Sequence, residues 1–322
     1  MNASRFGLGC MAMSGIYGPA DRAESLATID AAVEAGIVFL DTGDFYGMGQ
    51  NELLLGEALR RHRRDDLVLS VKFGGRRDPG GGWLRHDASP DGVKASLAYT
   101  LTRLGTDHVD VYRPARLDDH VPVEETIGAI GEMIDAGWVR QAGLSEVGPE
   151  TIRRAHATRP VADLQIEYSL VSRGIEAAIL PTCRELGIGI TAYGILSRGL
   201  LSGRWSAERE FAQSDFRAHA PRFQGENLER NLALVEALRT VADSKGATVA
   251  QLATAWVAAQ GGDVMPLVGA RSRDQLQESL GALSLELSAG DLAEIEAAVP
   301  PGAAAGDRYA PAAMATLDSE RA

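Results

Sequence analysis

The order of apolar and amphipathic segments predicts a (β/α)8 TIM barrel with long loops at the C-terminal face of its strands. Eight strand-sized apolar runs occur along the chain, with helical patterns between them. The runs are continuously hydrophobic, which is typical of parallel strands buried on both faces. A length of 322 residues suits one such barrel, which takes about 250 residues plus insertions. We therefore expect one domain over residues 1–322, with a mobile tail rich in Ala and Pro from about residue 300.

The eight expected strands mostly end in polar residues or glycine. They are Phe6–Met11, Ile37–Asp41, Leu67–Phe73, His108–Tyr112, Trp138–Ser145, Ala162–Tyr168, Gly187–Tyr193 and Val264–Gly269. A doubly wound open sheet is the alternative, and it would normally carry a ligand motif where the strand order reverses. The segment Gly7-Leu-Gly9-Cys-Met-Ala12 matches the loose dinucleotide fingerprint, but little chain precedes it and no helical pattern follows.

Helical patterns between the runs begin and end at recognisable signals. Asp21 is an N-cap with Glu24 three residues later, and Gly36 ends that helix. Ser89 and Pro90 begin a second helix. The others are expected over Pro122–Ala136, Pro149–His156, Ile175–Leu186, Leu228–Lys245 and Arg273–Leu283.

Two connections are longer than is normal in a compact domain. Gly74–Asp87 follows the third run, and Gly194–Glu226 follows the seventh. Loops of this length are usually binding loops or lids. Both leave the carboxyl ends of their strands, where the active sites of barrels lie.

Composition excludes several classes of function. The net charge of −12 disfavours binding to nucleic acid or to an anionic membrane. No apolar run approaches the roughly 20 residues of a membrane span, and no secretory signal is visible, so we expect a cytoplasmic protein. Two cysteines cannot build a disulfide framework. The six histidines form no metal-ligand pair, so we expect no metal site, which argues against a metal-dependent barrel hydrolase.

The segment Phe39-Leu-Asp41-Thr-Gly-Asp44-Phe-Tyr46-Gly47 carries the most informative chemistry. An apolar strand delivers Asp41 to its carboxyl end, and Tyr46 follows five residues later. The next run ends with Lys72 in an otherwise apolar setting. Adjacent barrel strands would bring all three side chains to one mouth. A structural ion pair beside a packed tyrosine is the alternative for each residue alone, whereas the joint pattern favours a functional site.

These three residue types suit carbonyl reduction. A phenol with a pKa near 10 is a poor proton donor unless a cation stabilises the phenolate. Lys72 supplies such a charge, and Asp41 can hold the ammonium in place. A tyrosine of this kind would protonate the carbonyl oxygen while hydride reaches the carbon. The hydride must come from a cofactor, because no side chain supplies it.

From about Phe6 to Leu287 the chain resembles the aldo-keto reductase family. The matching motifs occur in the family's order. They are Leu40-Asp41-Thr-Gly-Asp-Phe-Tyr46-Gly, Val71-Lys72, Gly143-Leu-Ser145, Leu164-Gln165-Ile-Glu-Tyr-Ser, Tyr193-Gly-Ile-Leu-Ser-Arg-Gly-Leu-Leu-Ser-Gly and Pro266-Leu-Val-Gly269-Ala-Arg271. The resemblance implies a metal-free (β/α)8 barrel that reduces aldehydes or ketones with NADPH. It also implies that Tyr46 is the general acid, Lys72 tunes it and Asp41 pairs with Lys72.

One position departs from the family pattern on the substrate side. Members usually place a histidine at the end of the fourth strand, and Ala115 stands there in this chain. The neighbouring Arg116 either donates a hydrogen bond to the substrate carbonyl or pairs with Asp118. Trp83, in the long loop after the third run, is a candidate for an apolar substrate pocket.

The resemblance also assigns residues to the cofactor. Ser145 and Gln165 would contact the nicotinamide carboxamide, although Glu146 replaces the usual asparagine. Tyr193 would stack on the nicotinamide ring. The remaining candidates line the rest of the cofactor. They are Leu196, Ser197, Arg198 and Gly199 for the pyrophosphate, and Gly269, Gln275, Glu278 and Ser279 around the adenosine.

Arg271 lies where the eighth strand leads into a helix. Amides at a helix start together with guanidinium groups make an anion site even in an acidic protein. We assign Arg271 to the adenosine 2′-phosphate, which predicts NADPH (and NADP+) over NADH. The alternative is an ordinary solvated helix N-terminus.

The sequence therefore predicts an NADPH-dependent reductase of a small carbonyl substrate. A cofactor-binding sensor or accessory protein with little turnover is the second hypothesis, and the missing histidine sustains it. The sequence identifies neither the aldehyde or ketone nor the oligomeric state.

Overall fold

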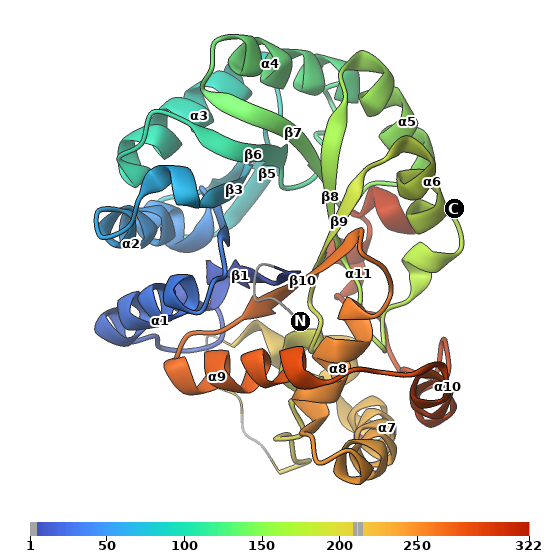
Figure 1. The fold of residues 1–322 in the computed structure, drawn as a ribbon. Helices are drawn as coiled ribbons and strands as arrows, with labels where there is room; N and C mark the ends of the chain where they lie inside the picture. Colours follow the sequence, from blue (N-terminus) through green and yellow to red (C-terminus); the bar gives the residue numbers. More distant parts are fainter. Residues whose placement is uncertain (1–4, 209–210, 212–214, 322) are drawn as a thin grey trace.

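Eight parallel strands close into a barrel in the computed structural model, which describes residues 5–208, 211 and 215–321 (Figure 1). Their order around the barrel is β1-β10-β9-β8-β7-β6-β3-β2. The strands are β1 (Gly7–Gly9), β2 (Phe39–Gly43), β3 (Val68–Phe73), β6 (Val109–Pro114), β7 (Val139–Ser145), β8 (Val161–Glu167), β9 (Gly189–Tyr193) and β10 (Val264–Gly269). The predicted (β/α)8 barrel is confirmed, and the doubly wound open sheet is excluded.

Helices surround the barrel, as Figure 1 shows. The helices near the expected positions are α1 (Arg22–Glu34), α3 (Pro90–Leu104), α4 (Val123–Asp135), α5 (Pro149–Thr158), α6 (Ile179–Leu186), α7 (Gly225–Ser244) and α9 (Arg273–Gly281). A short helix α11 (Pro311–Met314) lies near the C-terminus. Within the described residues, no helix is long and apolar enough to cross a bilayer.

Three further helices lie outside the expected set, which are α2 (Gln50–Leu59), α8 (Val249–Ala258) and α10 (Ala289–Ala298). Helix α2 begins after Gly49 in the left-handed region without a side-chain cap, so no N-cap signal marks its start. Helix α8 is buried at nearly every position and therefore has no amphipathic period.

The first connection and the loop after β3 differ from expectation. Strand β1 ends at Gly9, and Cys10–Ser14 form a 3₁₀ turn instead of extending the strand to Met11. The loop over residues 74–87 contains an antiparallel hairpin of β4 (Gly75–Arg77) and β5 (Trp83–His86). Asp78 closes its turn by accepting the amide of Gly82 at 2.8 Å.

The barrel interior carries a line of polar side chains among apolar ones. The Arg113 side chain is fully buried; it forms an ion pair with Asp163 and donates to the Ser70 hydroxyl at 2.8 Å. Ser70 lies beside Asp41 in the β2–β3 register, and Lys72 lies beside Gly43. Because all eight strands are parallel, their carboxyl ends meet at one mouth, where the functional side chains gather.

The C-terminal segment (residues 302–321) returns to the barrel. Arg308 and Leu317 are buried, and Asp318 accepts the amide of Gly148 at 2.8 Å. This differs from the mobile tail expected from about residue 300. The composition of the segment, rich in Ala and Pro, gave no sign of the buried arginine that anchors it.

Helix α2, which continues from the Tyr46 turn, packs against the end of α3 at Gly56. An added Cβ there would lie 2.6 Å from the Arg103 carbonyl oxygen and 2.8 Å from that of Leu104. We expect Gly56→Ala to lower the free energy of unfolding by about 1–3 kcal/mol, because backbone must move. Gly128→Ala in α4, where the new methyl group meets open space, should raise the free energy of unfolding by about 0.5–1 kcal/mol. Urea unfolding measures both variants, and equal changes in the free energy of unfolding would contradict the close approach of α2 and α3 at Gly56.

Candidate active site

The Asp41 carboxylate organises the centre of the mouth. It is buried at the end of β2 and forms an ion pair with Lys72. Its other oxygen accepts from the Ser70 hydroxyl and from the Gln165 amide, each at 2.7 Å. Burial of a carboxylate is tolerated because a cation and hydrogen-bond donors surround it. The predicted pairing of Asp41 with Lys72 is therefore present in the structure.

Tyr46 lies in the turn between β2 and α2. Asn51 secures this turn, because its carbonyl oxygen accepts from the Thr42 hydroxyl at 2.7 Å and its amide donates to the Cys10 carbonyl at 2.9 Å. The Lys72 Nζ lies 5.1 Å from the centre of the Tyr46 ring. The structure thus brings together the three side chains that the sequence singled out.

The electrostatic surroundings keep Tyr46 protonated. Burial raises the pKa of Tyr46 well above its usual value, and the Asp41 charge raises it further, whereas Arg116 lowers it. Burial lowers the pKa of Lys72, and the Asp41 carboxylate opposes that shift. The resting site therefore presents a neutral phenol close to cations, which is the form that can donate a proton.

Arg116 and Ala115 follow β6 at the same mouth. Ala115 is buried, and Arg116 is half-buried with Nη1 donating to the Ala115 carbonyl at 2.6 Å. Asp118 accepts instead from the backbone amides of Ala88 and His120. No Arg116–Asp118 ion pair forms, so that alternative is not observed.

An aromatic row leads from the hairpin to Tyr46. The Trp83 ring is 55% exposed, and its centre lies 5.6 Å from that of Phe45. The Phe45 ring meets Tyr46 edge-on at 4.8 Å. The Arg77 guanidinium stacks 3.4 Å from the Trp83 ring centre. Trp83 therefore lies at the outer end of a surface that continues to the tyrosine.

His86, on β5, is a residue that sequence reasoning missed. Its ring centre lies 6.2 Å from that of Trp83, and its Nδ1 is buried without a hydrogen-bond partner among the described residues. Burial and the Arg116 charge lower the pKa of His86 to about 4. The signal that could have identified His86 is its position in the long, glycine-rich loop over residues 74–87.

The candidates for the nicotinamide lie on three adjacent strands. Ser145 on β7 pairs in register with Gln165 on β8, and Tyr193 ends β9. The Gln165 amide donates to Asp41, so this side chain links the cofactor side to the Lys72 cluster. The Tyr193 hydroxyl donates to Glu146 at 2.7 Å and lies 3.0 Å from the Tyr309 hydroxyl.

The turn after β9 has unusual backbone geometry. Ser197, Arg198 and Gly199 follow Leu196 with φ values of 44°, 57° and 95°. Arg198 forms an ion pair with Glu167 at 2.9 Å, while its Nη1 is buried and has no partner among the described residues. The amides of Ser197 and Gly199 donate to the carbonyls of Gly194 at 2.6 Å and of Leu196 at 2.9 Å, so the backbone closes this turn on itself.

The residues assigned to the adenosine surround the start of α9. Gly269 is exposed at the end of β10, and the Gln275 side chain accepts from the Arg271 amide at 3.0 Å. Arg271 Nη1 lies 3.2–3.4 Å from the carbonyl oxygens of Tyr17, Gly18 and Pro19. Two candidates have partners inside the protein. Glu278 forms an ion pair with Arg204, and the buried Ser279 hydroxyl donates to the Gln275 carbonyl.

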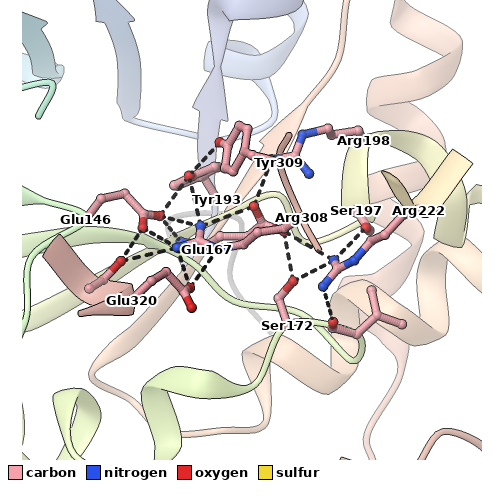
Figure 2. A network of polar contacts seen from close by, with 12 residues as sticks. Glu146, Glu167, Ser172, Tyr193, Ser197, Arg198, Arg222, Arg308, Tyr309 and Glu320 are labelled. Atoms are coloured by element: carbon pink, nitrogen blue, oxygen red, sulfur yellow. Dashed lines mark hydrogen bonds and ion pairs between the residues drawn. The ribbon is translucent and has the colours of Figure 1, made fainter. Parts of the chain in front are cut away.

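A buried charge network joins the C-terminal segment to the mouth, as Figure 2 shows. Arg308 lies between the carboxylates of Glu146 and Glu167, and Arg198 and Arg222 approach Glu167 from the other side. Sequence reasoning noted Glu146 only as a departure from asparagine and missed Arg308 altogether. The described residues contain no His, Cys, Asp and Glu cluster able to hold a metal ion.

Comparisons with known proteins agree on one family. The Aldo/keto reductase family model matches residues 5–300. "Probable aldo-keto reductase 1" of Glycine max is 43% identical over 309 residues, covering 95% of this chain and 88% of that protein. A glycerol dehydrogenase from Gluconobacter oxydans and a holo-form aldo-keto reductase from Bacillus halodurans superpose with TM-scores of 0.83 and 0.76. Each of these two proteins is 28% identical in sequence to this chain, and each superposition covers 92% of this chain and 92% of the other.

The closed barrel, the Asp41–Lys72 pair beside Tyr46 and these matches agree with one another. This chain therefore belongs to the aldo/keto reductase family, a family of oxidoreductases that reduce carbonyl groups.

Proposed function

We propose that this protein reduces an aldehyde or ketone to an alcohol with NADPH, and that Tyr46 donates the proton to the carbonyl oxygen. One observation carries the proposal. The buried Lys72 ammonium is paired with Asp41 and lies 5.1 Å from the centre of the Tyr46 ring. A structural ion pair alone does not account for a half-buried tyrosine held beside it at the mouth of the barrel.

The role of the cations is to stabilise charge as it forms. Tyr46 holds its proton in the resting site because burial disfavours the phenolate. When the proton moves to the carbonyl oxygen, negative charge develops on the phenol oxygen near Lys72 and Arg116. Fixed cations that interact more strongly with the transition state than with the ground state lower the activation barrier of the reduction.

Arg116 and Trp83 are the proposed substrate residues. Arg116 forms no ion pair among the described residues, and its half-buried guanidinium is available to donate to the carbonyl oxygen in place of the histidine replaced by Ala115. The exposed Trp83 ring provides an apolar wall that continues through Phe45 to Tyr46.

The donors at the end of β9 fit an anionic cofactor. When bound, NADPH supplies the hydride that no side chain can provide. Arg198 has a buried Nη1 without a partner among the described residues, and it lies in the left-handed turn from Ser197 to Gly199. We assign this turn, with Leu196, to the pyrophosphate. Ser145, Gln165 and Tyr193 are assigned to the nicotinamide.

The start of α9 fits the adenosine end of the cofactor. Arg271 donates only to carbonyl oxygens, so its charge is not neutralised by a carboxylate among the described residues. Arg273, by contrast, is paired with Glu24 at 2.8 Å. We therefore assign Arg271 to the 2′-phosphate. Gly269, Gln275 and Glu278 are the proposed adenosine neighbours, and Ser279 is the weakest of the set because its hydroxyl is bonded inside α9.

Replacement of Tyr46 tests the proton donor. Tyr46→Phe removes only the hydroxyl, so we expect the rate of carbonyl reduction to fall by about 10²–10⁴-fold while NADPH still binds. NADPH oxidation with a panel of aldehydes and ketones measures the rate, and fluorescence titration measures binding. Tyr99→Phe, at an exposed tyrosine of α3, is the control. Unchanged turnover in Tyr46→Phe would refute the assignment, and a wild-type protein that binds NADPH without turnover would favour the sensor hypothesis.

Replacement of Arg271 tests the choice of cofactor. Arg271→Ala should weaken NADPH binding by about tenfold or more, because a charge-assisted contact to the phosphate is lost. NADH binding should change little. Arg273→Ala is the matched control, since that guanidinium is exposed and paired with Glu24. Dissociation constants for both cofactors decide the matter, and equal losses for NADPH and NADH would contradict a phosphate contact.

A further inference from the structure

The C-terminal segment (residues 302–321) lies beyond the family match, which ends at residue 300. It nevertheless ends against the loop that follows β7. The Ser319 amide donates to the Glu146 carbonyl at 3.1 Å, and Asp318 accepts from the Gly148 amide at 2.8 Å. These contacts place the segment directly beside Ser145, the first residue assigned to the nicotinamide.

Arg308 is the centre of this attachment. Its guanidinium binds both carboxylate oxygens of Glu146, with Nη1 at 2.9 Å from Oε1. The same Nη1 lies 3.4 Å from Glu167 Oε2 and 3.5 Å from the Tyr193 hydroxyl. Figure 2 shows the guanidinium among these three side chains and Glu320, whose Oε1 accepts from Arg308 Nε at 2.9 Å. A planar fork of donors matches a carboxylate in this way, whereas an ammonium does not.

Glu146 depends on this arginine for its charge. Its side chain is fully buried, and across residues 5–208, 211 and 215–321 its ion-pair partner is Arg308. Burial acts to raise the pKa of Glu146, but the Arg308 contacts lower it to about 2. A buried carboxylate that loses its cation is strongly disfavoured. Glu167 is less dependent, since Arg198 and Arg222 also approach it.

Glu146 in turn fixes Tyr193. The Tyr193 hydroxyl donates to Glu146 Oε1 at 2.7 Å, and the same oxygen accepts from the Glu167 amide at 2.9 Å. Tyr309, the neighbour of Arg308, lies 3.0 Å from the Tyr193 hydroxyl and packs its ring 4.1 Å from the Arg198 guanidinium carbon. The segment therefore contacts, directly or through Glu146, the residues assigned to the ring and to the pyrophosphate.

We infer that Arg308 is a positioning residue for the cofactor, and that residues 302–321 complete the nicotinamide side of the site by holding Glu146 and Tyr193 in place. The inference rests on the proposed function, because it takes Tyr193 and Arg198 as cofactor contacts. Arg308 itself is assigned to neither the substrate nor the cofactor. Its effect passes through the Glu146 carboxylate to the ring of Tyr193.

The test compares variants of Arg308 with a control in the same segment. Arg308→Met should raise the dissociation constant of NADPH about tenfold, because Tyr193 is no longer held by an ionised Glu146. Arg308→Lys keeps the positive charge but loses the planar pair of donors, so its dissociation constant for NADPH should lie between those of Arg308→Met and the wild type. Arg321→Ala is the control, because among the residues the structure describes that exposed arginine contacts the Ala315 carbonyl and, at 3.6 Å, Asp119. The KM for NADPH should rise more than kcat falls.

A readout without cofactor separates this inference from the proposed function. In the cofactor-free protein, hydrogen exchange at the amides of Gly148 and Glu167 should be faster in Arg308→Met than in the wild type, because both amides donate into the anchored region. Protection elsewhere in the barrel should be retained. If the wild type binds no NADPH, the proposed function fails, and the exchange result still tests the anchoring.

The pH dependence of NADPH affinity distinguishes this positioning role from a general loss of stability, which would not make the affinity depend on pH. Glu146 faces Glu167, Tyr193, Arg308 and the more distant Arg116, and Glu320 pairs with the same Arg308 at 2.8 Å. Wild-type Glu146 stays ionised above about pH 4, so its contribution is constant. Without Arg308, burial is opposed only by weaker partners such as Arg116 and Ser319, so the pKa of Glu146 rises and NADPH affinity should fall as the pH is lowered. The inference would be overturned if Arg308→Met had the same NADPH affinity and the same amide exchange rates as the wild type, and if its NADPH affinity did not change with pH.

Discussion

The rest of the site depends on the burial of the Asp41 carboxylate at the mouth of the barrel. A carboxylate in this position is stable only with a cation and donors around it, and Lys72, Ser70 and Gln165 supply them. These partners come from β3 and β8, so the requirement ties strands on opposite arcs of the barrel to one point. The same requirement holds the Lys72 ammonium beside Tyr46, which gives the phenol a fixed electrostatic environment.

A second group of buried charges follows the same rule further along the mouth. Glu146 and Glu167 lie among Arg198, Arg222 and Arg308, and each of these side chains is nearly or fully inaccessible. Buried ion pairs contribute little net stability against apolar packing, yet breaking one partner is costly. Such a group therefore specifies geometry more than it adds stability. The group surrounds Tyr193, the residue assigned in our proposal to the nicotinamide ring.

Local sequence signals predicted the group formed by Asp41, Tyr46 and Lys72, but they did not predict the group of buried charges around Glu146. Asp41, Tyr46 and Lys72 were identifiable because each lies at or just after an apolar strand, and parallel strands end at the same mouth. The contact between Arg308 and Glu146 spans 162 residues and links a strand end to an Ala- and Pro-rich tail without any local pattern. Helix α8 escaped prediction because burial on all sides erases amphipathic periodicity. The unpaired Nδ1 of His86 depends on the hairpin fold, which spacing alone does not reveal.

Backbone strain independently marks the same mouth. In the described part of the chain, the non-glycine residues with left-handed φ are Met48, Glu146, Ser197 and Arg198. Each follows a strand end: Met48 lies two residues after Tyr46, Glu146 comes directly after Ser145, and Ser197 and Arg198 are themselves assigned to the cofactor. A non-glycine residue in this region costs about 1 kcal/mol or more, so it persists only where surrounding contacts over-determine it. For Glu146 those contacts are the hydrogen bonds with Gln165, Ser319 and Arg308, two of which come from the C-terminal segment. The chain therefore accepts strain where it positions the site, and the segment that reaches Glu146 is part of what makes this conformation stable.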